Sequence, residues 1–344
     1  MSAQPATIAP RLSGASRHVP ILAGVLVVLA GVLVLSISVG ARPIAIDRVW
    51  SLVVHPDGSD DAIIVQDLRI PRTILGLIVG AALGVAGALM QALTRNPLAD
   101  PGLLGVNAGA AAAVVTATAV FGITGTMGYI WFAFLGAGAA AVLVYGIGAT
   151  GRSGATPVRL ALAGTAVTFA LISYVQGLTL IDRQALDEYR FWQVGALAGH
   201  PASLNWQIAP FIAAGLLVAF ALARSLNAIG LGDDAGRGLG VSPARTRALG
   251  AVAVTLLCGA ATAAAGPIVF IGLTVPHVAR AICGPDQRWV MPYAALLAPV
   301  LLLGADIVGR VVNRPGELEV GIVSAVIGAP VFVAIVRRRR IAQL

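Results

Sequence analysis

The stretch that decides the fold reads RIPRTILGLIVGAALGVAGALMQALTRNPLADPGLLGVNAGA and runs from Arg69 to Ala110. Within it, Thr73 to Leu93 form a run of 21 residues without a charge, enough at about 1.5 Å per residue to cross a hydrocarbon core of roughly 30 Å. Pro71 suits a first helical turn, and the Asn96-Pro97 pair ends the helix because the residue before a proline leaves helical geometry. A second apolar run follows, so the stretch predicts a membrane-spanning helical hairpin.

The composition extends this prediction to the whole chain. Of its 344 residues, 58% are hydrophobic and 11% are charged, and the mean hydropathy is +0.90, far from the averages of soluble proteins. The long Leu, Val, Ala and Gly runs lack the alternation of a membrane β-barrel, which predicts an all-α polytopic membrane protein. We expect ten transmembrane helices, over residues 19–40, 72–93, 102–121, 129–149, 159–180, 206–223, 247–266, 268–283, 290–309 and 318–336.

The ionisable residues exclude several classes of function. All 23 basic residues are arginine, so a phosphate-binding loop that needs a lysine is excluded. Cys258 and Cys283 lie inside apolar runs, where they are expected to be small core side chains rather than metal ligands. We therefore expect no catalytic residue, metal site or cofactor in this chain, and no nucleic acid as a partner.

The distribution of arginine predicts the orientation. With ten crossings both termini share one side, and 15 of the 23 arginines then lie in the loops and tails of that side. The positive-inside rule therefore places both termini in the cytoplasm. Residues 1–18 are predicted to form a short cytoplasmic tail, and residues 19–344 a single transmembrane domain in the cytoplasmic membrane.

A polar island interrupts the apolar pattern at residues 224–247. Its core reads LGDDAGRGLGVSPARTRALG, from Leu231 onward. Asp233 and Asp234 suit the start of a short helix, because carboxylates favour the positive end of the helix dipole, and Gly240 suits its end. The segment is either a solvated loop or a surface helix that docks a cytoplasmic partner.

Three segments in order carry a resemblance to a known family. They are RIPR with RNPLADPGLLGVNAGA, then LGDDAGRGLGV, then GPIVFIGLTVPHVAR continuing to ADIVGR and ELEVGIVSAVIGAPVFVAIV. The chain resembles the permease subunits of FecCD/BtuC-type ABC importers, which take up iron-siderophores, haem or vitamin B12. This resemblance implies a BtuC-like permease of ten helices that pairs with an identical or paralogous permease subunit. It also implies two cytoplasmic ATPase subunits, which bind ATP and Mg, and an extracytoplasmic substrate-binding protein.

The resemblance assigns roles to individual residues at the two membrane faces. At the inner face it implies that the polar island inserts into the ATPase, through Asp233, Asp234, Ala235, Arg237, Leu239, Gly240 and Val241. At the outer face it implies that arginines grip carboxylates of the binding protein, at Arg69, Arg72 and Arg310, with Arg314 as a further contact. Guanidinium groups suit this role because each can bind a carboxylate with two hydrogen bonds. Alternatively, Arg69 and Arg72 only anchor the span at the membrane interface.

The resemblance also points to residues along the transport pathway. The inner gate of the family corresponds to Thr156, Pro157 and Val158, which differ from the small hydroxyl residues of the vitamin B12 permease. The segment FWQVGALAG, residues 191–199, resembles a half-helix that lines the pathway. Phe191 and Trp192 are thus either cargo contacts or interfacial anchors.

The predicted function is translocation of an iron chelate, most favourably a ferric siderophore, with haem or cobalamin as alternatives. A competing hypothesis is an ion-coupled secondary transporter whose coupling site is Asp306, a carboxylate well inside a predicted span. A third is a membrane scaffold without transport. We expect Arg310, one helical turn after Asp306, to be its partner.

Overall fold

The computed structural model describes residues 14–150 and 156–337, and within these ranges the chain is helical and contains no strand. The helices are α1 (Gly14–Ser38), α2 (Ile46–Val54), α3 (Asp60–Ile63), η1 (Ile64–Arg69), α4 (Ile70–Thr94), η2 (Pro101–Leu104), α5 (Val106–Phe121), α6 (Thr126–Ala149), α7 (Pro157–Ile181), α8 (Arg183–Val194), α9 (Ser203–Gly230), α10 (Asp233–Gly238), α11 (Pro243–Ala265), α12 (Ile271–Cys283), α13 (Gln287–Val312) and α14 (Val320–Arg337). The predicted all-α fold is confirmed. The tail predicted at residues 1–18 lies largely outside the described residues.

Each expected span overlaps one of the longer helices, and the count of ten crossings stays a prediction. Among the described residues, seven helices are long and apolar enough to cross a membrane: α1, the continuous helix that ends in α4, then α6, α7, α9, α11 and α13. The apolar helices α5, α12 and α14 are shorter. Two of them begin late because the backbone before them is left-handed, at Gly105 with φ 72° and at Phe270 with φ 68°.

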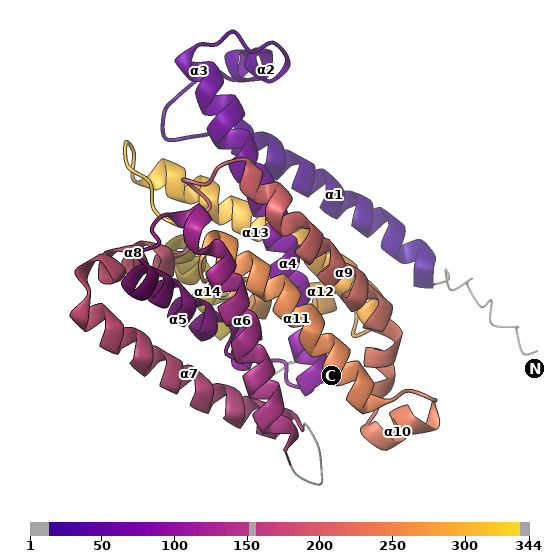
Figure 1. Ribbon diagram of the computed structural model, residues 1–344. Coiled ribbons are helices and arrows are strands. Elements are labelled where there is room, and N and C mark those ends of the chain that lie inside the picture. The colour runs from indigo at the N-terminus through magenta and orange to yellow at the C-terminus, as the bar shows by residue number, and fades with distance from the viewer. Residues whose placement is uncertain (1–13, 151–155, 338–344) are drawn as a thin grey trace, which may run out of the picture.

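The helix α4 lies at the centre of the bundle (Figure 1), in contact with α9, α11, α12 and α13. Glycines on α4 allow this close packing. A Cβ atom at Gly84 would lie 2.5 Å from the carbonyl oxygen of Ala294, and one at Gly87 would lie 1.9 Å from that of Gly272. Small residues are the usual means of bringing membrane helices into contact, because lipid supplies no hydrophobic drive between them.

Short helices mark the two ends of the bundle. The helices α2 and α3 project from one end, and α10 lies at the other (Figure 1). The first end has a small core of its own, made by Val49, Leu52, Ala62 and Val65. The second contains the polar island, which is more helical than expected because α9 continues to Gly230 and α11 begins at Pro243. We call the end that carries α2 and α3 the arginine end, and the opposite end the α10 end.

Candidate functional site

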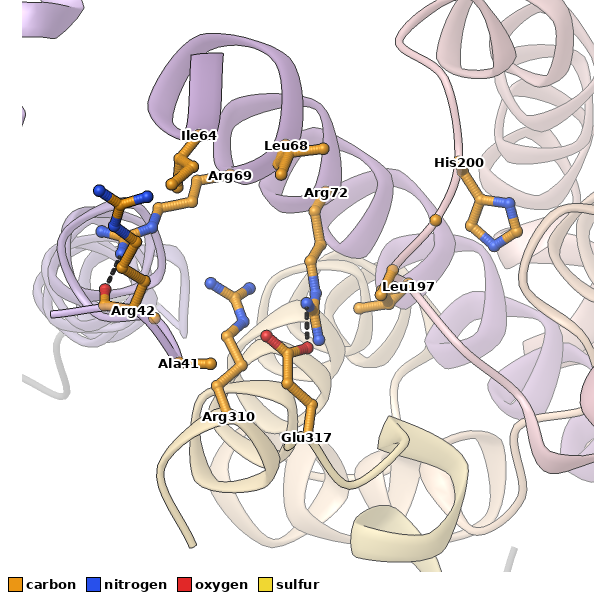
Figure 2. A pocket seen from close by; sticks show the side chains of 13 residues that line it. Ala41, Arg42, Ile64, Leu68, Arg69, Arg72, Leu197, His200, Arg310 and Glu317 are labelled. Atoms are coloured by element: carbon orange, nitrogen blue, oxygen red, sulfur yellow. Dashed lines mark hydrogen bonds and ion pairs between the residues drawn. The ribbon is translucent and has the colours of Figure 1, made fainter. Parts of the chain in front are cut away.

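Four arginines line a cavity of about 300 Å³ at the arginine end, together with Glu317 and His200. We call Arg42, Arg69, Arg72 and Arg310 the arginine cluster. Figure 2 shows that Arg310 extends from below toward the space between Arg69 and Arg72. The sequence therefore correctly placed the first residues of α4 and the end of α13 on one face, although they are more than 230 positions apart.

A single buried carboxylate holds two members of the cluster. Asp306 is fully buried, and its Oδ1 accepts a hydrogen bond from Nη2 of Arg72 at 2.7 Å. Its Oδ2 accepts from Nε of Arg310 at 2.9 Å, in the predicted partnership one turn along α13. Arg72 also donates to Glu317 at 2.6 Å, an ion pair that sequence reasoning missed because Glu317 lies in the turn after α13. The network joins α4 to α13 by charge-assisted hydrogen bonds.

The remaining donors of the cluster, together with Arg314 outside it, bind carbonyl groups at and just after the carboxyl end of α1. Arg69 donates to the carbonyl oxygens of Ile37, Ser38 and Arg42, Arg310 to those of Ser36 and Val39, and Arg314 to that of Gly40. A helix leaves its last carbonyl groups without intrahelical partners, and cations there also complement the dipole. The cluster thus ties α1 to α4 and α13.

The predicted docking arginines differ in how exposed their side chains are. Arg310 is 1% exposed and Arg69 is 4% exposed, so both act from beneath the surface in this conformation. Arg72 is intermediate, and Arg314 is exposed at the rim. Arg42, which the sequence analysis did not single out, also lines the cavity and pairs with Asp61 at 3.3 Å. Of these five arginines, Arg42 and Arg314 are therefore the exposed ones.

A second cavity, of about 270 Å³, borders the first. Its wall includes Trp192, Phe191, Tyr129, Glu319 and His200. Phe191 is 82% exposed, whereas Trp192 is 7% exposed, so the adjacent aromatic residues face different surroundings. The half-helix expected over residues 191–199 has other bounds in the structure. The helix α8 starts at Arg183 and ends at Val194, just before Gly195, whose φ is 75°.

The two cavities share His200, which lies in the segment after α8. Burial lowers the pKa of His200, and the Arg72 charge lowers it further, although its hydrogen bond with the Ala196 carbonyl raises it. Burial also raises the pKa of Glu319. In both groups the largest cause is burial, which disfavours the charged form.

At the opposite end the predicted surface helix is present as α10, with Asp233 and Asp234 in its first turn. Asp234, Ala235 and Arg237 on α10 are exposed, as are Leu239 and Gly240 just after it, and Val241 is intermediate. Leu239 is exposed beside the ion pair of Arg237 with Asp234 at 2.5 Å. Such a mixed apolar and charged face suits contact with another protein. Asp233 instead turns inward, which the sequence did not reveal.

The predicted gate residues form the start of α7, at the α10 end (Figure 1). Thr156 is the N-cap residue, and its hydroxyl accepts a hydrogen bond from the amide of Arg159 at 3.4 Å. Pro157 occupies the first turn, and Val158 is exposed. The three residues thus set where α7 begins, directly after residues 151–155, which lie outside the described part of the chain.

Comparison with known proteins gives a consistent result. The sequence pattern of the FecCD transport family matches residues 26–338. The ferric enterobactin transport system permease protein FepD of Escherichia coli (strain K12) is 46% identical over 317 residues, which cover 92% of this chain and 94% of the relative. The iron(3+)-hydroxamate import system permease protein FhuB of Bacillus subtilis (strain 168) is 43% identical, over 89% of this chain and 80% of the relative. A solved structure described as an inward-facing metal-chelate type ABC transporter superposes with a TM-score of 0.81 at 25% identity, covering 93% of this chain and 99% of that chain.

Proposed function

Because the chain belongs to the FecCD transport family, we propose that it is the permease subunit of an ATP-driven importer that carries a ferric siderophore across the cytoplasmic membrane. The observation that carries the proposal is the match over almost the full length to relatives named for ferric enterobactin and iron(3+)-hydroxamate. These names favour a siderophore over haem or cobalamin. The chain itself supplies a path and moving parts, while ATP and Mg bind to separate ATPase subunits.

The arrangement of the two ends supports a direction of transport. We assign the arginine end to the outer face and the α10 end to the cytoplasm, with ten crossings and both termini inside. The arginine-rich loops at the α10 end agree with the positive-inside rule. The arginine cluster then faces a binding protein that delivers cargo, and the exposed face of α10 meets the ATPase.

The exposed surface of α7 supports the proposal that a second permease subunit is present. This helix exposes the polar residues Ser173 and Gln176 beside Phe169 and Leu180. A polar side chain that faces lipid is costly, so we infer that this face meets a partner or a water-filled path. A second copy or a paralogue would enclose the path with it, with Phe191 near the cargo.

Ion-coupled transport through Asp306 is disfavoured by its surroundings. Arg72 and Arg310 occupy both oxygens of this carboxylate. Coupling sites of secondary transporters lie where an ion or proton reaches them, near the membrane midplane. Asp306 thus serves as a counter-ion for the docking arginines, and the energy comes from ATP.

Charge reversal at Arg314 tests the proposed docking at the outer face. In a complex of this subunit with its permease and ATPase partners in lipid nanodiscs, the cargo-loaded binding protein should stimulate ATP hydrolysis. We expect Arg314→Glu to raise the half-saturating concentration of binding protein about tenfold or more, because like charges that meet across an interface cost several kcal/mol.

The matched control is Arg183→Glu, which makes the same change on α8, outside the arginine cluster, and should leave that concentration unaltered. Equal stimulation of the Arg314→Glu complex and wild type would contradict the docking role. A wild-type complex that captures no ATPase, or that no binding protein stimulates, would contradict the proposed function as a whole.

A further inference from the structure

Two neighbouring carboxylates at the start of α10 differ in their exposure and in their partners. The Asp234 side chain is 99% exposed, and its ion pair within the described residues is with Arg237 on the same helix. Asp233 reaches back to the bundle, where its Oδ1 accepts from Arg95, just after α4, and from Nη2 of Arg247 on α11 at 2.8 Å. We call Asp233, Arg95 and Arg247 the inner clamp. It joins three elements through one oxygen atom.

The inner clamp is electrostatically unbalanced without Asp233. Arg247 has a side chain that is 11% exposed, and the Nε atoms of both arginines are buried without a partner in the described structure. Burial lowers the pKa of Arg95, and the nearby Arg247 charge lowers it further. Asp233 is thus the shared counter-ion of two guanidinium groups that otherwise repel each other.

The helix α4 connects the inner clamp directly to the arginine cluster. Its 25 residues span about 37 Å at 1.5 Å per residue. Arg72, in its first turn, binds Asp306, and Arg95, immediately after its last residue, binds Asp233. Between these ends Gly84 and Gly87 hold α4 against α13 and α12 at backbone contact, so the helix has little freedom to bend on its own.

We propose that Asp233 is a positioning residue that fixes α10 to α4 through Arg95, so that a displacement of α10 moves α4 and reaches the Arg72 and Asp306 pair at the opposite face. This inference rests on the proposed function, in which α10 meets the ATPase. The proposal gives two different roles to the residues of this segment. The exposed residues from Asp234 to Gly240 contact the partner, and Asp233 links them to the bundle.

A simpler role for Asp233 predicts a different outcome. A carboxylate at a helix start is stabilised by the dipole, typically by 0.3–1 kcal/mol, and asparagine is a comparable residue at that position. If Asp233 did no more than that, Asp233→Asn would leave transport unchanged. Loss of the shared counter-ion instead separates α10 from α4 while leaving its outer face intact.

The test measures cargo transported per ATP hydrolysed in proteoliposomes that contain the complete complex, with ferric enterobactin as the probe. Allosteric coupling is typically worth 5- to 150-fold, and we expect Asp233→Asn to lower the ratio of cargo to ATP about tenfold. Arg95→Gln should lower it similarly. The double variant should be no worse than Asp233→Asn alone, because that substitution already removes the contact with Arg95.

Arg288→Gln is the matched control. It removes a different ion pair at the α10 end, between the exposed Arg288 and Asp286 at 2.7 Å, and should keep the wild-type ratio. A wild-type ratio in Asp233→Asn, or additive losses in the double variant, would overturn the proposal. Failure of Asp233→Asn to retain the ATPase during purification would also overturn it, by making Asp233 a contact residue. If the wild-type complex shows no ATP-driven uptake, the proposed function fails instead.

Discussion

Asp306→Asn is expected to destabilise the folded subunit by about 3–5 kcal/mol, the cost of breaking a buried ion pair by removing one partner. The amide would leave Arg310 buried without a counter-ion and Arg72 with only Glu317. Release of α1 should follow, because Arg310 also holds the carbonyl groups at its end. The measurement is denaturant unfolding of the purified subunit in mixed micelles.

Glu317→Gln supplies the control for this substitution. It removes a carboxylate from the same Arg72, but the Glu317 side chain is 31% exposed, so we expect a loss of at most about 1 kcal/mol. Similar stability of the Asp306→Asn and Glu317→Gln variants would show that Asp306 does not hold the arginine cluster together.

Gly87→Ala is expected to cost about 3 kcal/mol or more, at or beyond the usual range for overpacking. The added Cβ atom would lie 1.9 Å from the backbone oxygen of Gly272, and no side-chain rotation can relieve that contact. The helices α4 and α12 would have to separate along their shared face. Thermal unfolding in detergent, followed by loss of the monodisperse peak in size-exclusion chromatography, measures the effect.

Gly138→Ala is the matched control, because a Cβ atom there would meet nothing within 4 Å. In the interior of α6 this substitution should leave stability unchanged or raise it by up to about 1 kcal/mol, since alanine favours the helix. A Gly87→Ala subunit that unfolds at the wild-type temperature would refute the close approach of α4 to α12.

The central helix could be predicted from sequence almost to its ends. The expected span of 72–93 compares with 70–94 in the structure, because charges and the Asn96-Pro97 pair mark both limits. The starts of α5 and α12 could not be predicted, because apolar runs do not reveal the left-handed residues Gly105 and Phe270. The helix α2 was missed, and the half-helix expected at residues 191–199 overlaps only the end of α8, because hydropathy identifies spans and not short amphipathic helices.

The position of the candidate site could be predicted from sequence, but the contacts between residues distant in the sequence could not. The sequence predicted that the proposed docking arginines lie at span ends and that Asp306 pairs with Arg310, since residues four apart on a helix face each other. It could not show that Asp306 also holds Arg72, because that contact joins residues 234 positions apart. For the same reason the inward turn of Asp233 toward Arg95, 138 positions away, was hidden.

We propose that this helical bundle transports a ferric siderophore only when an ATPase drives it. The direct measurement is uptake of labelled ferric enterobactin into proteoliposomes, with the loaded binding protein outside and ATP and Mg inside. We predict accumulation that requires both the ATPase subunits and ATP and that persists when a protonophore abolishes the proton gradient. Uptake by the permease subunits alone, or uptake without ATP that the protonophore abolishes, would contradict the claim.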